Sequence, residues 1–369
     1  MLASDPVQTI VDPQDAAISV GLNYVSDDQP GITRHRAGKG FAYRDRGGAL
    51  LREGGTLARI KSLAIPPAWT SVWICPSANG HIQATGRDAR GRKQYRYHPR
   101  FREIREGAKF EHVVAFGCAL PRLRQKVQCD LALRGMPRNK ILAAVVHLLD
   151  TTLIRIGNEA YAKDNNSYGL TTLKSRHVVV SGAEIRFRFT GKSGRLWSLR
   201  INDRRIARII KVCQELPGQA LLQYVDADGG CQGISSTDVN DYLRELSGHD
   251  FTAKDFRTWA GTVLASMALQ ELHGFDSQAM AKANLRTAIE RVAARLGNTP
   301  TICRKCYVHP EILNAYLDGS LVQDIKLEAE AQLRSKLAGM FPEEAAILAM
   351  LMNRLKRPTK IKAIFAKAA

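Results

Sequence analysis

The feature that most constrains the fold is a change in the spacing of apolar residues at about residue 100. Before it, short apolar runs are interrupted by Gly and Pro pairs, which is typical of a small β-sheet, and we expect strands near 72–75, 81–85 and 93–97. After Pro99 apolar residues recur at three- and four-residue steps, which is typical of amphipathic helices. The chain is therefore predicted to be an α+β protein with a β-rich domain followed by a larger, mostly α-helical one.

We place the boundaries so that a tail covers residues 1–31, the β-rich domain 32–104 and the helical domain 105–369. The tail is rich in Asp, Pro and Ser and has little periodicity, so we expect it to form a loose arm. In the helical domain, apolar spacing and capping residues predict four well-defined helices, over residues 137–155, 236–246, 254–273 and 278–296. The stretch from Leu327 is also expected to be helical and to end in a basic tail.

One β-hairpin is predicted inside the helical domain, over residues 184–201. Ile185, Phe187 and Phe189 alternate with charged residues, and the return strand alternates in the same way. The four residues GKSG join the two strands, so Lys192 is expected at an exposed turn. Although GKS resembles part of a nucleotide-binding phosphate loop, the leading Gly of that motif is missing, and we expect no nucleotide cofactor.

Charge is the strongest bulk property. The chain has 54 Lys and Arg against 35 Asp and Glu, a net charge of +19, which indicates a polyanionic partner. The stretch from Arg87 to Glu106 carries eight basic and three acidic residues, and tyrosines lie among them. The tail from Arg354 carries six basic residues and no acidic one. Basic residues interleaved with aromatics favour nucleic acid over a membrane or an acidic protein.

Other classes of protein fit less well. Seven scattered cysteines suit a reducing compartment, and Cys303 and Cys306 lack the second Cys or His pair that a zinc site needs, so we expect no metal. No apolar run reaches the roughly 18 to 20 residues that span a bilayer, and the first residues lack the pattern of a signal peptide. We expect a cytoplasmic, nucleoid-associated protein without a membrane partner.

Several segments, in order and at characteristic separations, resemble the type IB DNA topoisomerases of bacteria and poxviruses. They are GRKQYRYHP, LIRIGNEAYAKDNNSYGLTTLKSRHV, FTGKSG, AKDFRTWAGT and LGNTPTICRKCYVHP. The separations are 37 residues from Arg155 to Lys192, 65 from Lys192 to Arg257 and 50 from Arg257 to Tyr307. The resemblance extends over nearly the whole chain from about Ile32, and it implies a catalytic domain of the topoisomerase and tyrosine recombinase kind.

The resemblance implies a role for each matching residue. Tyr307 would be the nucleophile that forms a 3′-phosphotyrosyl link, Arg155 and Arg257 would hold the scissile phosphate, and Lys192 would be the general acid. Asn298 occupies the position where many members carry His. Because an amide can donate a hydrogen bond but cannot transfer a proton at working pH, any role of Asn298 would be electrostatic.

The resemblance also implies contacts with double-stranded DNA by the β-rich domain of a monomer that clamps the duplex. The residues concerned are Arg87, Lys93, Gln94, Tyr95 and Tyr97. On a strand, Tyr95 and Tyr97 would share one face while Arg96 lies on the other. The implied activity is relaxation of supercoiled DNA without ATP or metal.

Two alternatives stay open at this point, a tyrosine recombinase and a non-enzymatic architectural DNA binder. Recombinases usually carry H-x-x-R at the second arginine, whereas here Lys254 precedes Arg257 in K-D-F-R. The architectural binder rests on the charge of +19 alone.

Overall fold

The computed structural model describes residues 12–38, 40–89, 91–226, 228–272, 274–326 and 340–356. The chain divides into two compact units, Met1–His112 and Val113–Ala369, and the division falls inside helix α3 (Pro99–Leu131). Helix α3 begins where the apolar spacing changes. The predicted helical start at Leu327 and most of the predicted basic tail lie outside the described residues.

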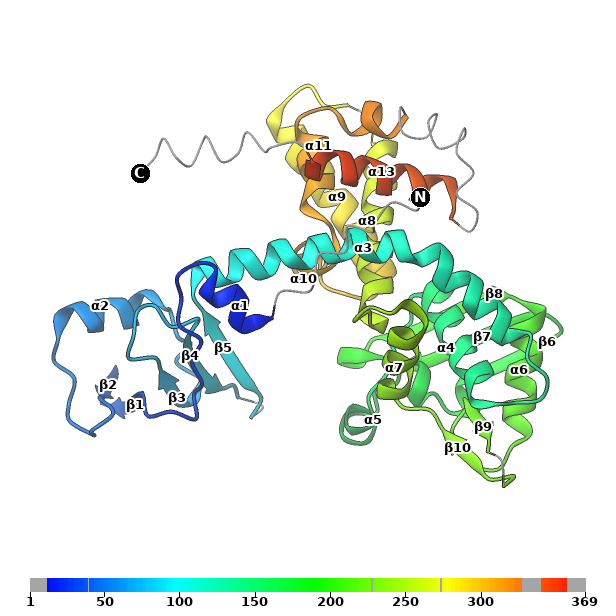
Figure 1. Cartoon of the computed structure of the whole chain (residues 1–369), viewed down its shortest axis with the longest axis horizontal. Helices are drawn as coiled ribbons and strands as arrows, with labels where there is room; N and C mark the ends of the chain where they lie inside the picture. Colours follow the sequence, from blue (N-terminus) through cyan, green and yellow to red (C-terminus); the bar gives the residue numbers. More distant parts are fainter. Residues whose placement is uncertain are drawn as a thin grey trace, which may run out of the picture. The chain divides into compact units, whose positions relative to one another are not determined.

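The first unit is built on a five-stranded antiparallel sheet with the order β2-β1-β3-β4-β5 (Figure 1). Its strands are β1 (Ile32–Ala37), β2 (Gly40–Arg44), β3 (Thr70–Ile74), β4 (Ile82–Arg87) and β5 (Lys93–Tyr97). The last three match the predicted strands, whereas β1 and β2 were not predicted. Helix α2 (Gly54–Ser62) packs against the sheet through Ile60, which clusters with Val72, Ile74 and Ala84.

Residues 12–31, predicted as part of a loose arm, belong to the first unit and pack against the rest of it. Helix α1 (Pro13–Ile18) buries Ala16 and Ala17 beside Phe101. Farther along, the backbone N–H of Val25 donates to His81 Nδ1 at 3.0 Å. The sequence did not indicate this packing, because six helical residues are too few to show a period, although Leu22 is also buried in the same cluster.

The second unit is mainly helical, as expected. Its helices beyond α3 are α4 (Arg138–Thr152), α5 (Glu159–Asn165), α6 (Arg204–Glu215), α7 (Ser236–Ser247), α8 (Ala253–Glu271), α9 (Gln278–Leu296), α10 (Pro300–Tyr307), α11 (Pro310–Leu317) and α13 (Pro342–Lys356). The predicted helices correspond to α4, α7, α8 and α9. None of the described helices is long and apolar enough to cross a membrane.

Helix α4 ends earlier than predicted. Its last helical residue is Thr152, and Leu153 adopts a left-handed conformation with φ 60°. Arg155 therefore lies in the segment after the helix and not on its last turn.

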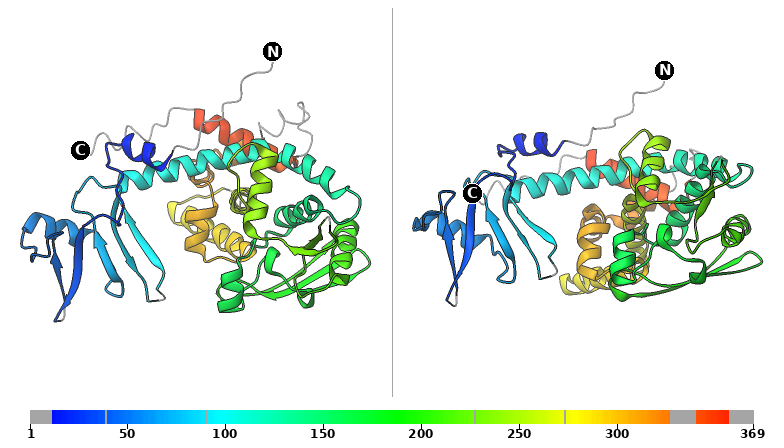
Figure 2. Two further views of the ribbon diagram at one scale, coloured as in Figure 1. Left: turned by 60° about the horizontal axis from the view of Figure 1, so that its bottom comes forward. Right: turned by 90° about the horizontal axis from the view of Figure 1, so that it is seen from below.

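A three-stranded antiparallel sheet of order β6-β7-β8 lies within the second unit, and α6 packs on β6 and β7 (Figure 2). Strand β6 covers Val178–Ser181, β7 Glu184–Thr190 and β8 Leu196–Asn202. The predicted hairpin is confirmed, with Glu184 opposite Asn202 and Thr190 opposite Leu196. A short two-stranded sheet, β9 (Gln223–Val225) and β10 (Cys231–Gly233), completes the unit.

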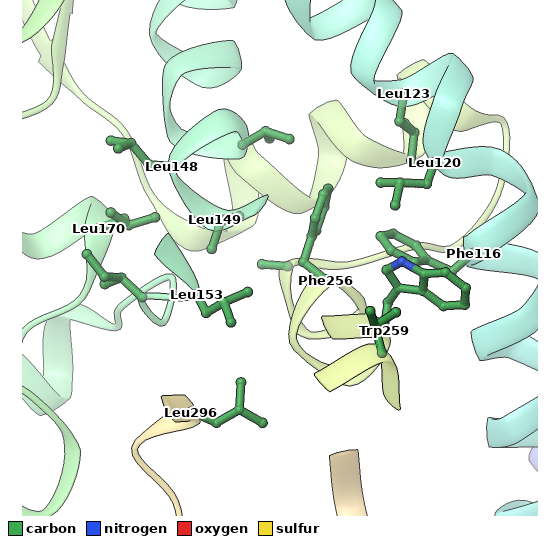
Figure 3. Packing of buried hydrophobic residues seen from close by; sticks show 14 of the residues in the cluster. Phe116, Leu120, Leu123, Leu148, Leu149, Leu153, Leu170, Phe256, Trp259 and Leu296 are labelled. Carbon is green, nitrogen blue, oxygen red and sulfur yellow. The ribbon is translucent and has the colours of Figure 1, made fainter. Parts of the chain in front are cut away.

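Helix α8 runs through the hydrophobic core of the second unit. Figure 3 shows its Phe256 next to Leu149 and Leu153 of the α4 region, and its Trp259 beside Phe116 of α3. The rings of Phe116 and Phe256 meet edge to face, with centroids 4.9 Å apart. This packing holds α8 rigidly, and α8 carries one of the predicted catalytic arginines.

A partly buried polar network ties α8 to three other helices. Arg124 of α3 forms ion pairs with Asp150 of α4 at 2.7 Å and with Glu344 of α13 at 2.6 Å. Trp259 Nε1 donates to the same Glu344 at 3.0 Å. Buried charges are tolerated only when they are paired and hydrogen-bonded, so this network sets the mutual arrangement of the helices.

Candidate active site

Tyr307 is the last residue of α10, a helix that begins with Thr299 as N-cap and Pro300 in its first turn. The side chain is half-buried. Immediately after it, the backbone N–H of His309 donates to Thr262 Oγ1 on α8 at 3.1 Å. Tyr307 is thereby held against the middle of α8.

Arg257 lies on α8 next to the Tyr307 ring. Its guanidinium carbon is 5.4 Å from the centroid of the Tyr307 ring. The side chain is only 3% exposed, and it donates to two backbone carbonyls, Leu153 and Leu296, the latter at 2.6 Å. Because it is buried and bridges the ends of α4 and α9, Arg257 is not the ordinary surface arginine that its helix pattern alone allowed.

Arg155 and Asn298 meet across the site. Arg155 Nη2 donates to the Asn298 side-chain oxygen and, at 3.1 Å, to the carbonyl of Gly297. Asn298 follows Gly297, the left-handed C-cap of α9 with φ 64°. Its amide Nδ2 is buried and has no hydrogen-bond partner among the described residues, so it can donate to an incoming acceptor.

Two glycines allow backbones to approach closely at this site. A Cβ on Gly261 of α8 would lie 2.4 Å from the carbonyl oxygen of Tyr307, and a Cβ on Gly169 would lie 2.5 Å from that of Arg155. Contacts this short exclude any side chain. The backbone N–H of Leu170 also donates to the Arg155 carbonyl at 2.9 Å, which fixes the segment that carries Arg155.

Lys192 lies in the turn between β7 and β8, as predicted, and is exposed. The turn is closed by a backbone hydrogen bond in which Gly191 N–H donates to the Arg195 carbonyl at 2.8 Å. Arg195 Nη2 donates to the Ala294 carbonyl near the end of α9 at 2.9 Å. The Lys192 turn is thus attached to the helix that leads into Asn298.

The electrostatics of the site suit an anion. Burial and the charge of Arg155 lower the pKa of Arg257 to about 10, so its guanidinium is protonated at neutral pH. Burial also lowers the pKa of Arg155, with Arg195 adding to the effect and Tyr307 opposing it. Over the described ranges, the hydrogen bonds of Arg155 and Arg257 go to carbonyl and amide oxygens and to the Tyr307 side chain, and none goes to a carboxylate. Two neighbouring cations without an acid are stabilised by a bound phosphate.

The Cys303 and Cys306 pair lies on α10, beside the site. Burial raises the pKa of Cys303 to about 11, so its thiol is protonated at neutral pH. In the part of the chain that the structure describes, no group of three or more His, Cys, Asp or Glu could hold a metal ion.

The predicted DNA-binding residues of the first unit lie on both faces of β4 and β5. Tyr95 and Tyr97 share one face, as predicted, with their rings stacked 5.7 Å apart and 41% and 37% exposed. Arg96 lies on the other face, where it donates to the Ala64 carbonyl at 3.0 Å. Gln94 is on the Arg96 side of the strand and donates to Asp88 Oδ2 at 3.0 Å.

Arg87 and Lys93 are paired opposite each other at the end of the β4–β5 hairpin. Arg87 donates to the Gly91 carbonyl at 2.9 Å. Lys93 forms an ion pair of 2.7 Å with Asp27, which also accepts a hydrogen bond from Thr85. Asp27 belongs to the segment predicted as a loose arm, so no sequence signal linked it to Lys93.

Comparison with known families and proteins connects this geometry to a known group. The family described as eukaryotic DNA topoisomerase I, catalytic core, matches residues 98–354, and the bacterial DNA topoisomerase IB N-terminal domain matches residues 40–88. The chain belongs to the type IB DNA topoisomerase family. This type IB topoisomerase is 32% identical over 295 residues to DNA topoisomerase 1B of Acanthamoeba polyphaga mimivirus, which covers 78% of this chain and 87% of the relative.

Poxvirus relatives are more distant. DNA topoisomerase 1B of vaccinia virus (strain Copenhagen) is 22% identical over 237 residues, 63% of this chain and 72% of the relative. DNA topoisomerase I of monkeypox virus matches to the same extent. Membership of the type IB family decides against the tyrosine recombinase and the architectural binder.

Sequence reasoning missed the residues that bring the site of this topoisomerase together. They are Gly169, Gly261 and Gly297, which permit close approach, and Arg195 and Trp197, which attach the hairpin to α9. A glycine in a helix such as α8 is a local signal that a neighbour comes close, but it does not say which neighbour.

Proposed function

We propose that this type IB topoisomerase relaxes supercoiled duplex DNA by cutting and rejoining one strand through Tyr307. The observation that carries the proposal is the convergence of Arg155, Arg257 and the Asn298–Tyr307 stretch, which are three distant segments of the chain. The roles below are assigned to these residues on the basis of that geometry and of the family.

In the first step, the Tyr307 phenolic oxygen attacks the scissile phosphorus and the bond to the 5′ oxygen breaks. A phenol has an ordinary pKa near about 10 and must lose its proton to attack. Positive charge from Arg257, whose guanidinium lies 5.4 Å from the ring, favours the phenolate. Asn298 cannot accept the proton, so we assign its removal to water.

Charge that grows on the non-bridging oxygens needs donors already in place. Arg155 and Arg257 present planar guanidinium groups, and Asn298 Nδ2 adds a buried amide donor. Loss of one such donor costs on the order of 3 to 4 kcal/mol of transition-state stabilisation. These three groups together provide the stabilisation that a phosphoryl transfer requires.

The leaving 5′ oxygen needs a proton, and we assign it to the Lys192 ammonium. The product is a 3′-phosphotyrosyl ester, which resembles in energy the phosphodiester that was broken. Resealing is the reverse reaction, in which the 5′ hydroxyl attacks, Tyr307 leaves and Lys192 recovers its proton. No nucleotide hydrolysis is needed, and the arginines and Lys192 supply the charge and the proton, so the proposed reaction proceeds without added metal.

While the 5′ end is free, the duplex can rotate and release supercoils of either sign. We propose that the protein acts as a monomer and that both units contact the same duplex. In the first unit, Tyr95 and Tyr97 present a polar aromatic surface suited to a groove, while Arg87 and Lys93 suit the phosphate backbone.

The decisive test compares the native chain with Tyr307→Phe, which removes the nucleophile alone. The native chain should relax supercoiled plasmid in EDTA and, with a suicide substrate, form a covalent adduct that mass spectrometry places on Tyr307 with a 3′ linkage. Tyr307→Phe should bind duplex DNA with unchanged affinity and form no adduct.

Tyr224→Phe, at a half-buried tyrosine of β9, is the matched control and should relax plasmid at the native rate. An adduct on another residue, a 5′ linkage, or full relaxation by Tyr307→Phe would refute the proposal.

A further inference from the structure

The proposed general acid Lys192 must be held at a fixed distance from the phosphate-binding residues. The Lys192 ammonium donates no hydrogen bond to any residue that the structure describes. The next two residues of the turn, Ser193 and Gly194, both have positive φ, 64° and 74°. The side chain therefore takes its position from the turn. A general acid must come within about 2.6–3.2 Å of the oxygen that it protonates, so whatever places the turn places the acid.

The indole ring of Trp197 lies between the Lys192 turn and the Asn298 turn. A Cβ on Gly191, the residue before Lys192, would lie 2.7 Å from Trp197 Cδ1. A Cβ on Gly297, the residue before Asn298, would lie 2.8 Å from Trp197 Cζ2. One rigid ring thus rests its five-membered end on the first turn and its six-membered end on the second.

Both sides of this contact are anchored. Trp197 lies opposite Phe189 in the β7–β8 pairing, and their rings are stacked, with centroids 6.2 Å apart and planes 4° from parallel. Phe189 is buried in the main core. On the other side, the Gly297 carbonyl accepts the hydrogen bond from Arg155 at 3.1 Å.

We propose that Trp197 is a positioning residue that sets the distance between the general acid Lys192 and the phosphate site formed by Arg155 and Asn298. The proposal rests on the proposed function. Tryptophan suits this role because its bicyclic ring reaches both glycines, whereas a phenyl ring is too short to contact both. In this proposal the indole contacts neither the phosphate nor the leaving oxygen and acts on the reaction by placing the Lys192 turn.

The test uses the chemistry of the leaving group. A substrate with sulfur in place of the bridging 5′ oxygen leaves as a thiolate, whose conjugate thiol has a pKa of about 8.5, so it does not need a general acid. A residue that acts through Lys192 matters for the oxygen substrate and not for the sulfur substrate. A residue that supports the whole site matters for both.

We expect Trp197→Phe to slow single-turnover cleavage of the oxygen substrate by about 10- to 100-fold, since a misplacement of about 1 Å costs up to 10²-fold. On the sulfur substrate it should cleave within about 3-fold of the native rate. Gly191→Ala places a Cβ against the five-membered end of the same ring. It should likewise slow cleavage of the oxygen substrate and leave cleavage of the sulfur substrate nearly unchanged. Combined with Trp197→Phe, it should cost less than the product of the two single effects.

Three controls make the result specific. Lys192→Ala should be slow on the oxygen substrate and close to the native rate on the sulfur substrate, a difference that we call sulfur rescue. Asn298→Ala should be slow on both substrates. Leu196→Ala changes an exposed residue of the same strand and should leave both rates unchanged. Duplex affinity and melting temperature of every variant are measured alongside, and Trp197→Leu serves as a second variant should Trp197→Phe be unstable.

Equal losses on both substrates for the Trp197 variants, or no loss on either, would overturn the inference. If the native chain forms no adduct, or Lys192→Ala shows no sulfur rescue, the proposed function or its general acid fails and the inference fails with it. If Lys192→Ala is rescued and the Trp197 variants are not, only the inference fails.

Discussion

Because Gly261 has no side chain, the backbone at the proposed nucleophile, Tyr307, can lie directly against α8. A Cβ there would meet the Tyr307 carbonyl oxygen at 2.4 Å and the Tyr307 Cβ at 3.1 Å. The same segment is hydrogen-bonded to Thr262, one residue farther along α8. The backbone of Tyr307 therefore cannot move away from an added methyl group without breaking its own anchor.

We expect Gly261→Ala to destabilise the protein by about 1–3 kcal/mol, the usual cost of overpacking, and to slow DNA cleavage by at least 10-fold because Tyr307 is displaced from Arg257. Cleavage rate and urea unfolding measure the two effects. Gly107→Ala is the matched control, since Gly107 is also helical and an added Cβ meets nothing within 4 Å. Similar effects at both positions would contradict the argument.

Among the elements, the ends of α4, α8 and α9 meet at one guanidinium. Arg257 of α8 donates to the carbonyls of Leu153, after α4, and Leu296, the last residue of α9. Helix ends leave carbonyls without intrahelical partners, and these two are satisfied by the same side chain. Arg257 thus joins the elements that present Arg155 and Asn298, in addition to its proposed contact with phosphate.

Arg257→Lys should therefore affect stability as well as catalysis. A lysine ammonium cannot reproduce the fork, so at least one buried carbonyl loses its donor, at a cost of about 1–3 kcal/mol in the free energy of unfolding. Urea unfolding of the whole chain measures it. Arg291→Lys, in an exposed ion pair with Glu271, should change the free energy of unfolding by less than about 0.5 kcal/mol. Equal stability of the two variants would refute the bridging role of Arg257.

For the whole molecule, the net charge of +19 governs the encounter with DNA. With roughly 6 to 10 phosphate contacts, duplex affinity should fall by about 10³- to 10⁵-fold between 50 and 200 mM salt, because bound counterions are released. A fluorescence anisotropy titration of a short duplex over this range tests the prediction. Tyr307→Phe should show the same slope, since it changes no charge, and an affinity independent of salt would contradict the proposed duplex contacts.

The amino-acid sequence was sufficient for the properties that depend on local pattern. Apolar spacing predicted α7, α8 and α9 and the start of the helical region, because helix formation follows residues three and four apart. Alternation predicted the β7–β8 hairpin with Lys192 at its turn. The order and separation of the motifs identified the family and the residues now proposed to be catalytic.

Tertiary structure alone decided what these residues contact. Helix ends and a hairpin meet in space, and three contacts depend on this. Arg257 is buried, Arg155 donates to Asn298, 143 residues away, and Trp197 lies between Gly191 and Gly297. The packing of residues 12–31 within the first unit was also decided by tertiary contacts, which Ala16 and Asp27 make. Local periodicity specifies which face of an element is apolar, but it does not specify which distant backbone that face will touch, since that depends on the packing of all the elements at once.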